Sequence, residues 1–427
     1  MISAVVGCSL VLLLAIGMPV AFAFVGTAFA YLVALWNVPF IVLPQKMVTS
    51  IDSFPLIAVP FFVLVGLVMN TGGATDRIFR FARRLVGHIP GGLGHANVAA
   101  NMIMAGMSGS AVADAAGLGQ VIVKAMVDDD YDRPFIAALT ASGSTIGPII
   151  PPSIAMVVYG SIVGASVPRL LLGGLVPGVL MGLAMMAYVW YIAKKRGYPR
   201  HPRATLREVG ASLWETTPAL LTPVILLGGM VTGIFTPTEA AAVAAAYAVL
   251  LTCWIQREMD LRSLVATFVE TLVVVSVILI IIAAAGLVGW ILNWQGVNEL
   301  IGTFIFENVK SPALILLFIN IFLLIVGCFI EANAALITLT PILFPIIVKA
   351  GIDPVHFGVM MVLNLMIGLI TPPVGMSMYI LCDIAKVSTL EFSREIWPFV
   401  IALVVVLILV TYFPALVLFV PDLVMGK

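Results

Sequence analysis

Long apolar runs separated by short polar segments occupy almost the whole chain of 427 residues. A helix that crosses a lipid bilayer needs about 20 mainly apolar residues. By that measure the candidate spans are residues 3–17, 18–36, 53–72, 131–163, 170–193, 216–235, 237–256, 263–292, 354–384 and 396–420. Only "GMP" separates the first two, which leaves open whether residues 3–36 form two spans or one kinked helix. The pattern predicts an all-α polytopic membrane protein.

Two further apolar segments, 92–127 and 311–349, are too long for a single span and have a polar or glycine-rich centre. The centres read "GMSGSAVAD" (106–114) and "GCFIEANAA" (327–335). A polar centre between two apolar arms predicts a re-entrant helical hairpin, which enters and leaves the membrane on one face. Such backbone is tolerated at membrane depth only where protein buries it or where it lines a cavity.

Composition excludes a soluble protein, because 62% of the residues are hydrophobic and only 10% are charged, against about 25% charged in soluble domains. Acidic and basic residues balance at 21 each, so nothing indicates a nucleic-acid partner. The four cysteines lie in apolar runs without CxxC spacing, which favours packing over metal binding or disulfides. The N-terminus has no basic region and no A-x-A site, so we interpret it as a mature membrane helix.

Positive charge predicts the orientation. With the N-terminus outside, the cytoplasmic side receives every lysine and arginine except Lys46, Arg169, Lys310, Lys349 and Lys427. This excess agrees with the positive-inside rule and predicts a periplasmic N-terminus. Residues 75–88 alternate apolar and basic side chains at helical spacing and are expected to lie at the cytoplasmic interface, with 297–309 as an outer counterpart.

The chain contains a weak internal repeat. Shifted by 221 residues, "IGPIIPPSIAM" (146–156) lies over "IGLITPPVGMS" (367–377) without a gap, and the same offset pairs Gly106 with Gly327. Each half then has five spans and one hairpin, and an odd number places the second half upside down. This inverted-repeat plan is typical of secondary transporters, whose sites lie on broken helices near the midplane.

The repeat defines the predicted domains: a first repeat over 1–193, a cytoplasmic connector over 194–215 and a second repeat over 216–427. The hairpins and broken helices, roughly 92–163 and 311–384, would form a mobile transport domain. The remaining spans would form a scaffold.

The prolines in each half interrupt a helix at membrane depth. A helix-interior proline costs about 3 kcal/mol, and carbonyls that lose their partners inside lipid cost several kcal/mol each. A kink satisfied by neighbouring helices is the alternative, but two copies beside polar hairpins favour an ion site. Hard cations such as sodium prefer oxygen ligands. By this argument the candidate sodium-binding residues are Ser108, Ser110, Ser144, Thr145, Gly147, Asn333, Gly368, Thr371 and Gly375.

The N-terminal ends of half-helices also attract anions. The candidate substrate-binding residues are Ser110, Pro152, Glu331, Asn333 and Pro373. Glu331 is equally well explained as the cap of a helix that begins near Ala332. Asp114 is expected to cap a helix or bond to the Ser108–Ser110 loop, and Glu239 in "TPTE" is expected to complete a capping box.

Three motifs resemble the large membrane subunit of tripartite ATP-independent periplasmic (TRAP) transporters. They are "NMIMAGMSGSAVADAAGLG" (101–119), "ALTASGSTIGPIIPPSI" (138–154) and "GLITPPVGM" (368–376). The resemblance implies sodium-driven import of an organic acid anion, of C4-dicarboxylate or sialic acid type, by an elevator motion in the bacterial inner membrane. It also implies two partners on separate chains, a small four-helix membrane subunit and a periplasmic substrate-binding protein. It further implies that the sodium sites lie between each hairpin tip and its broken helix, which adds Gly143, Pro151, Gly327 and Met376 to the candidate sodium-binding residues.

Other function classes are weaker. A stand-alone sodium/dicarboxylate symporter of a related elevator fold would need no binding protein. An intramembrane enzyme needs a nucleophile with a base or a metal cluster, and the scattered histidines offer neither. A purely structural subunit leaves the doubled hairpin and break unexplained. We therefore expect no enzyme activity, and no cofactor besides Na⁺ as the coupling ion.

Overall fold

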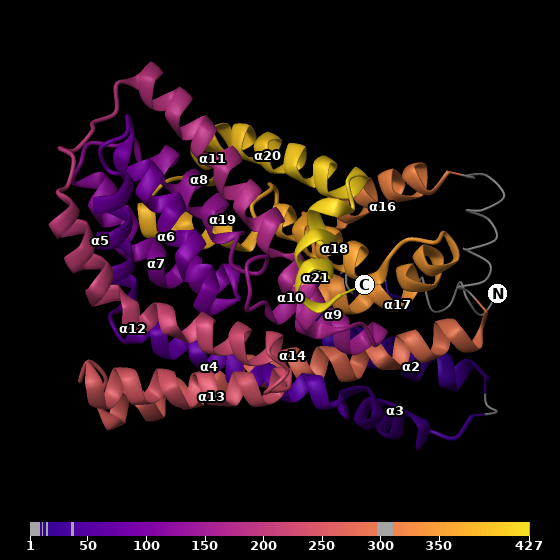
Figure 1. The fold of residues 1–427 in the computed structure, drawn as a ribbon. Helices are drawn as coiled ribbons and strands as arrows, with labels where there is room; N and C mark the ends of the chain where they lie inside the picture. The colour runs from indigo at the N-terminus through magenta and orange to yellow at the C-terminus, as the bar shows by residue number, and fades with distance from the viewer. Residues whose placement is uncertain (1–8, 11, 14–15, 36–37, 297–310, 427) are drawn as a thin grey trace.

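A computed structural model describes residues 9–426 except 11, 14–15, 36–37 and 297–310, and the described chain is helical without a strand (Figure 1). The first half contains α2 (Val20–Leu35), α3 (Val42–Ile51), η1 (Phe54–Ile57), α4 (Ala58–Thr71), α5 (Ala74–Val86), α6 (Gly92–Ser108), α7 (Ala111–Val127), α8 (Arg133–Ser144), α9 (Ile154–Val163), α10 (Val167–Gly173) and α11 (Leu175–Arg196). The second half contains α12 (Leu206–Val231), α13 (Pro237–Leu250), η2 (Leu251–Ile255), α14 (Leu261–Trp294), α16 (Pro312–Gly327), α17 (Ala332–Lys349), α18 (Pro354–Gly368), α19 (Met376–Ala385), α20 (Thr389–Tyr412) and α21 (Ala415–Met425).

Six stretches within the described residues are long and apolar enough to cross a membrane: Phe54–Thr71, Val167–Arg196, Pro237–Ile255, Leu261–Trp294, Ala332–Lys349 and Thr389–Tyr412. Together with the composition, they confirm an all-α polytopic membrane protein. Most of the predicted span 3–17 and the whole predicted helix 297–309 lie outside the described residues.

Each of the two predicted hairpins and the two predicted broken helices consists of two helices with a non-helical centre. The segment 92–127 contains α6 and α7, which meet at Gly109 in the left-handed conformation (φ +62°) and the N-cap Ser110. The segment 311–349 contains α16 and α17 with residues 328–331 between them. In the other two, residues 145–153 separate α8 from α9 and residues 369–375 separate α18 from α19, and each separating stretch has a cis Pro-Pro bond.

Two predicted span boundaries were wrong. The last span, 396–420, is two helices, because Pro414 lacks a backbone donor and disfavours helical backbone at Phe413. The predicted span 170–193 is confirmed within the apolar stretch Val167–Arg196, in which α10 and α11 meet at Gly174. The connector 194–215 is helical from Leu206, because Thr205 and Glu208 form a capping box that starts α12 ten residues before the predicted span.

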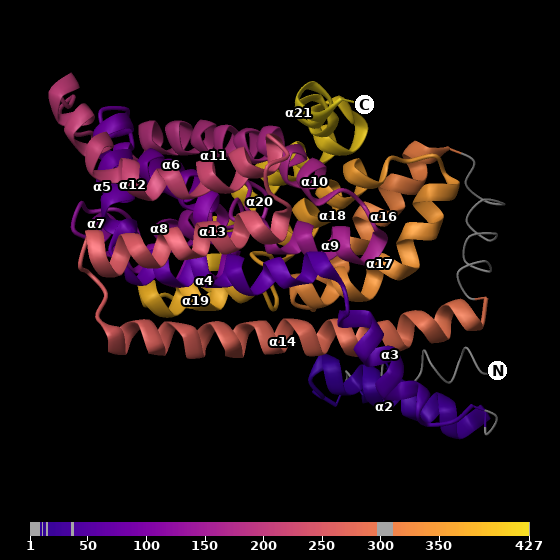
Figure 2. The same cartoon turned by 60° about the horizontal axis from the view of Figure 1, so that its bottom comes forward.

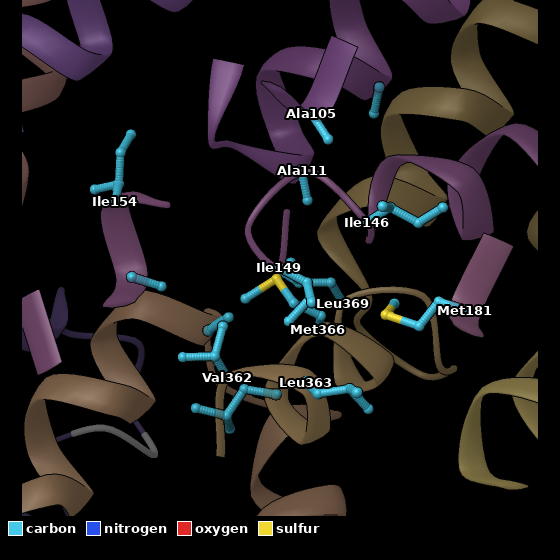
Figure 3. Close-up of a cluster of buried hydrophobic side chains, with 14 of the residues drawn as sticks. Ala105, Ala111, Ile146, Ile149, Ile154, Met181, Val362, Leu363, Met366 and Leu369 are labelled. Atoms are coloured by element: carbon cyan, nitrogen blue, oxygen red, sulfur yellow. The ribbon is translucent and has the colours of Figure 1, made fainter. Parts of the chain in front are cut away.

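The two halves interlock around the broken helices. Helix α9 packs against α17 and α18 of the second half, and α19 packs against α7 and α8 of the first half. The two hairpins lie at opposite ends of the molecule, α6 and α7 at one end and α16 and α17 at the other (Figures 1 and 2). Between the breaks, Ile149 lies beside Met366 and Leu369 in an apolar cluster (Figure 3).

Outer helices surround this centre. Helix α14, about 51 Å long by its 34 residues, packs against α2, α3, α4 and α17 along one side (Figure 2). Helix α13 packs between α4 and α12, and the predicted capping box of Thr236 and Glu239 at its start is confirmed. Helix α5 joins α4 to the first hairpin and packs against α6 and α12.

Candidate ion and substrate sites

The tip of the first hairpin presents two serines beside the first helix break. The Ser110 hydroxyl accepts a hydrogen bond from the Ala113 backbone amide (3.4 Å) and so caps α7. Ser108 is buried, and its hydroxyl lies next to the Asp114 carboxylate. A Cβ atom on Gly109 would lie 2.6 Å from the Pro152 carbonyl oxygen, so the tip and the break are in direct contact.

The break itself offers oxygen atoms. Ser144 and Thr145 are fully buried, and their hydroxyls donate to the carbonyls of Ala141 (2.8 Å) and Ser142 (2.6 Å), which leaves the hydroxyl lone pairs unused. Within the described residues, the carbonyls of Thr145, Gly147 and Pro151 accept no hydrogen bond. These groups therefore present acceptors without presenting donors.

Asp114 lies at the point where the tip and the break meet. Asp114 is 1% exposed, its carboxylate interacts with the Ser108 hydroxyl, and no cationic side chain among the described residues pairs with it. A Cβ atom on Gly147 would lie 2.6 Å from the Asp114 Oδ2 atom and 3.3 Å from the Ser110 carbonyl carbon. Of its two expected roles, the helix cap was wrong, since Ser110 caps α7, whereas the interaction with the Ser108–Ser110 loop is present through the Ser108 hydroxyl. Asp114 was not among the predicted binding residues, although an acidic residue inside an apolar run indicates a functional site.

Gly143 lies away from the hairpin tip. A Cβ atom there would lie 2.7 Å from the Asn101 Nδ2 atom in the first hairpin arm, and its carbonyl accepts the Ile146 amide (3.1 Å). Pro151 and Pro152 face the hairpin, because the Pro151 carbonyl oxygen would lie 3.9 Å from a Cβ atom on Gly106.

The second hairpin and the second break enclose a cavity of about 170 Å³. Its walls are Gly327, Cys328, Phe329, Ile330, Glu331, Leu369, Val374, Gly375 and Met376. The backbones approach closely here, because a Cβ atom on Gly368 would lie 2.5 Å from the Gly327 carbonyl oxygen. Four sequence-predicted residues line this cavity: Gly327, Glu331, Gly375 and Met376.

Glu331 both caps a helix and lines the cavity. Its Oε2 atom accepts the Ala334 amide (2.9 Å) at the start of α17, and its Oε1 atom accepts the Asn333 side-chain amide (2.9 Å). The Thr371 hydroxyl donates to the Ile367 carbonyl (2.7 Å) and retains its acceptor lone pairs. Pro373 is exposed, and its carbonyl accepts the Tyr379 hydroxyl (3.1 Å).

Buried amides, which sequence reasoning missed, bind each hairpin to its own broken helix. Asn97 in α6 donates to the Thr140 hydroxyl in α8 (2.8 Å). Asn364 in α18 donates to the Asn320 side-chain oxygen in α16 (2.7 Å). Single asparagines inside apolar runs were the available signal, because buried polar groups are normally hydrogen-bonded.

A family model described as "Tripartite ATP-independent periplasmic transporter, DctM component" matches residues 7–416. The chain belongs to this transporter family. It is 42% identical over 414 residues to the sialic acid TRAP transporter large permease protein SiaM of Vibrio cholerae, covering 97% of both chains. It is 38% identical to the 2,3-diketo-L-gulonate TRAP transporter large permease protein YiaN of Escherichia coli, covering 95% of both.

The sialic acid TRAP transporter permease protein SiaT of Haemophilus influenzae is 42% identical over 96% of this chain, and the chain spans 66% of the length of that relative. The chain is thus a large permease protein and a multi-pass protein of the bacterial inner membrane, and its relatives are named as permeases rather than enzymes. In fold, it is similar to the Alcanivorax borkumensis YdaH transporter, with a TM-score of 0.57, 14% identity, and coverage of 90% of this chain and 89% of that one.

Proposed function

We propose that this chain is the permease subunit of a sodium-coupled importer of an organic acid anion. One observation carries the proposal: Asp114 is a buried carboxylate that pairs with no cationic side chain among the described residues, where a hairpin tip meets a broken helix. A lone charge in a low-dielectric interior is costly unless an opposite charge compensates it. No ion pair joins Asp114 to a described residue, and residues 100–123 and 134–165 contain no lysine or arginine, so a bound cation would be the counter-charge.

The oxygen atoms around Asp114 suit sodium. The Ser110 and Ser144 hydroxyls and the freed Gly147 carbonyl would join the carboxylate in the first site, since hard cations select oxygen. A second ion would bind at the cavity formed by the Gly327–Glu331 tip and the Leu369–Met376 break. Water molecules or protein donors would also suit these acceptor atoms. The comparison of uptake in sodium with uptake in potassium distinguishes bound sodium from such donors.

The substrate anion would bind between the two sites. Residues 312–348 and 354–385 also contain no lysine or arginine, so no basic side chain on these helices can balance a carboxylate. The N-termini of α7, α17 and α19 and the bound cations would supply that positive charge instead. Substrate affinity would then depend directly on sodium.

The partners follow from the family. A periplasmic binding protein would deliver the anion to the outward-facing side, where the N-terminus also lies, and a small four-helix membrane subunit would hold the scaffold. The bonded hairpins and broken helices would then move together as an elevator. The relatives are named for sialic acid, 2,3-diketo-L-gulonate and, in Pseudomonas aeruginosa, C4-dicarboxylate, which supports an organic acid substrate of the C4-dicarboxylate or sialic acid type.

The test is uptake of a radiolabelled acid into proteoliposomes that contain this chain with both partner proteins. Uptake is expected to stop when external sodium is replaced by potassium at equal ionic strength. Uptake that is equal in both salts would contradict sodium coupling. Uptake by this chain without a binding protein would instead identify a stand-alone symporter.

A further inference from the structure

Helices α7, α8 and α19 pack against one another, and α7 and α8 lie at one end of the molecule (Figure 2). A second cavity, of about 220 Å³, lies between residues of these three helices. It is lined by Gln120, Val123, Lys124, Val127, Asp128, Arg133 and Ile384. This volume is below the roughly 300 Å³ at which pockets for drug-sized ligands begin. The charge pattern of the sequence predicts that this end faces the cytoplasm.

The basic groups in the cavity have unused donors. The Lys124 ammonium has no hydrogen-bond or ion-pair partner among the described residues. Arg133 uses its Nη1 atom to donate to the Ala385 carbonyl at the end of α19 (3.2 Å), which leaves most of the guanidinium donors free. The Gln120 side chain adds an amide. Two cations and an amide around one hollow are a donor set for an oxyanion.

The start of α8 beside the cavity also lacks its side-chain cap. Asp132 precedes α8 but does not bond to its first turn, because its carboxylate accepts the Tyr198 hydroxyl (2.7 Å) and the Arg196 guanidinium (3.2 Å) instead. In the second half, the matching Asp353 accepts the Val355 and His356 amides (2.8 and 3.0 Å). The uncapped end adds positive potential at Arg133.

We propose that this cavity binds a phosphate group through Lys124 and Arg133. Arginine matches phosphate with a planar fork of donors, and lysine adds a mobile point charge. The phosphate can belong to a soluble phosphate or to an anionic lipid headgroup of the cytoplasmic leaflet. A bound phosphate would bridge α7 and α8 of the first half to α19 of the second half. Asp128 opposes this binding, because its carboxylate lies in the same lining.

The test uses the full chain in nanodiscs and records its melting temperature. One arm titrates inorganic phosphate against chloride at equal ionic strength in neutral phosphatidylcholine. The other arm replaces phosphatidylcholine with increasing phosphatidylglycerol in the absence of phosphate. Stabilisation in the first arm identifies a soluble phosphate, and stabilisation in the second identifies a headgroup.

Three variants make the test specific. Lys124→Gln is expected to raise the phosphate or phosphatidylglycerol concentration for half-maximal stabilisation about tenfold or more, since a charged hydrogen bond of this kind contributes about that factor to the affinity. Asp128→Asn is expected to lower the concentration for half-maximal stabilisation. Lys386→Gln is the matched control, because Lys386 is exposed, pairs with Asp383 and does not line the cavity. The proposal is overturned if neither arm stabilises the wild-type protein, or if Lys124→Gln responds as Lys386→Gln does.

Discussion

At the scale of single residues, Asp114 and two glycines, Gly147 at the first site and Gly368 at the second, decide the geometry of the two candidate sites. The absence of a Cβ atom on Gly147 leaves room for the Asp114 carboxylate at the break, and the absence of one on Gly368 lets two backbones touch at the second site. Neither effect depends on glycine flexibility. Both depend on close approach between segments that are distant in the sequence.

Replacing Asp114 by asparagine tests the first site. The change keeps the shape of the side chain and removes its charge, so the half-saturating sodium concentration for uptake is expected to rise about tenfold or more. The measurement is uptake against sodium concentration in proteoliposomes. Asp383→Asn is the control, because that carboxylate is 83% exposed. An unchanged sodium dependence in Asp114→Asn would remove the carboxylate from the site.

Ser110→Ala and Thr371→Ala probe the hydroxyls of the two sites separately. Each hydroxyl retains acceptor lone pairs near its break, so each variant is expected to need more sodium for half-maximal uptake. The same sodium titration measures the effect. If neither variant shifts the curve, these two side chains are not ligands.

Gly368→Ala tests the close approach at the second site. The added methyl would lie within 2.5 Å of the Gly327 backbone, and overpacking of this kind costs about 1–3 kcal/mol. We expect a lower melting temperature and reduced uptake. Gly228→Ala in α12 is the matched control, because nothing lies within 4 Å of its Cβ position and alanine favours helix by up to about 1 kcal/mol. Equal melting temperatures for the two variants would contradict the tight contact.

At the scale of elements, the capped start of α12 shows how local chemistry extends a helix beyond its membrane span. The Thr205 hydroxyl accepts the Glu208 amide (3.3 Å), and the Glu208 carboxylate accepts the Thr205 amide (2.7 Å). These bonds from Thr205 hold the pKa of Glu208 below its ordinary value. The stabilisation is therefore complete above the pKa of the unfolded chain and is lost as the pH falls through the lower folded value.

Hydrogen exchange of the Arg207–Val209 amides measures this cap. Protection in the wild-type protein is expected to fall on acidification through the folded pKa, whereas Glu208→Gln is expected to lack this pH dependence. Glu215→Gln is the control, because Glu215 is an exposed acid further along the same helix. Wild-type protection that does not change with pH would show that the carboxylate does not hold the first turn.

At the scale of the whole molecule, ion pairs outside the membrane spans join segments that are far apart in the sequence. Arg77 in α5 donates to both Glu258 oxygens (2.6 Å each), to the Gln256 side chain (2.7 Å) and to the Gly72 carbonyl (3.2 Å). Arg196 at the end of α11 bonds to Asp132 and Glu395. These contacts join the start of α5 to the segment after η2, and the end of α11 to the start of α8 and to α20.

Glu258→Gln tests the first of these connections. The Arg77 and Glu258 side chains are only 14% and 33% exposed, so losing the charged pair is expected to cost about 1–2 kcal/mol and to lower the melting temperature. Asp383→Asn removes an ion pair whose members are 71% and 83% exposed, and it is expected to change the melting temperature little. Similar losses in both variants would show that burial does not strengthen the Arg77 pair.

The sequence by itself determined the class of protein, the apolar spans, the four interrupted segments and the oxygen-rich residues beside them. These are local properties, because hydrophobicity decides what enters lipid and proline decides where a helix stops. Helix ends were less certain where caps or prolines lie near a span, as at Leu206 and Phe413.

The tertiary structure decided which of these groups meet. Asp114 and Gly147 are 33 positions apart, and Gly327 and Gly368 are 41 apart, and no local pattern brings either pair into contact. The cross-packing of α9 on α17 and of α19 on α7 is likewise a matter of shape. Whether a carboxylate has a charged partner depends on every element packed around it, and the pattern of residues along the sequence does not contain that information.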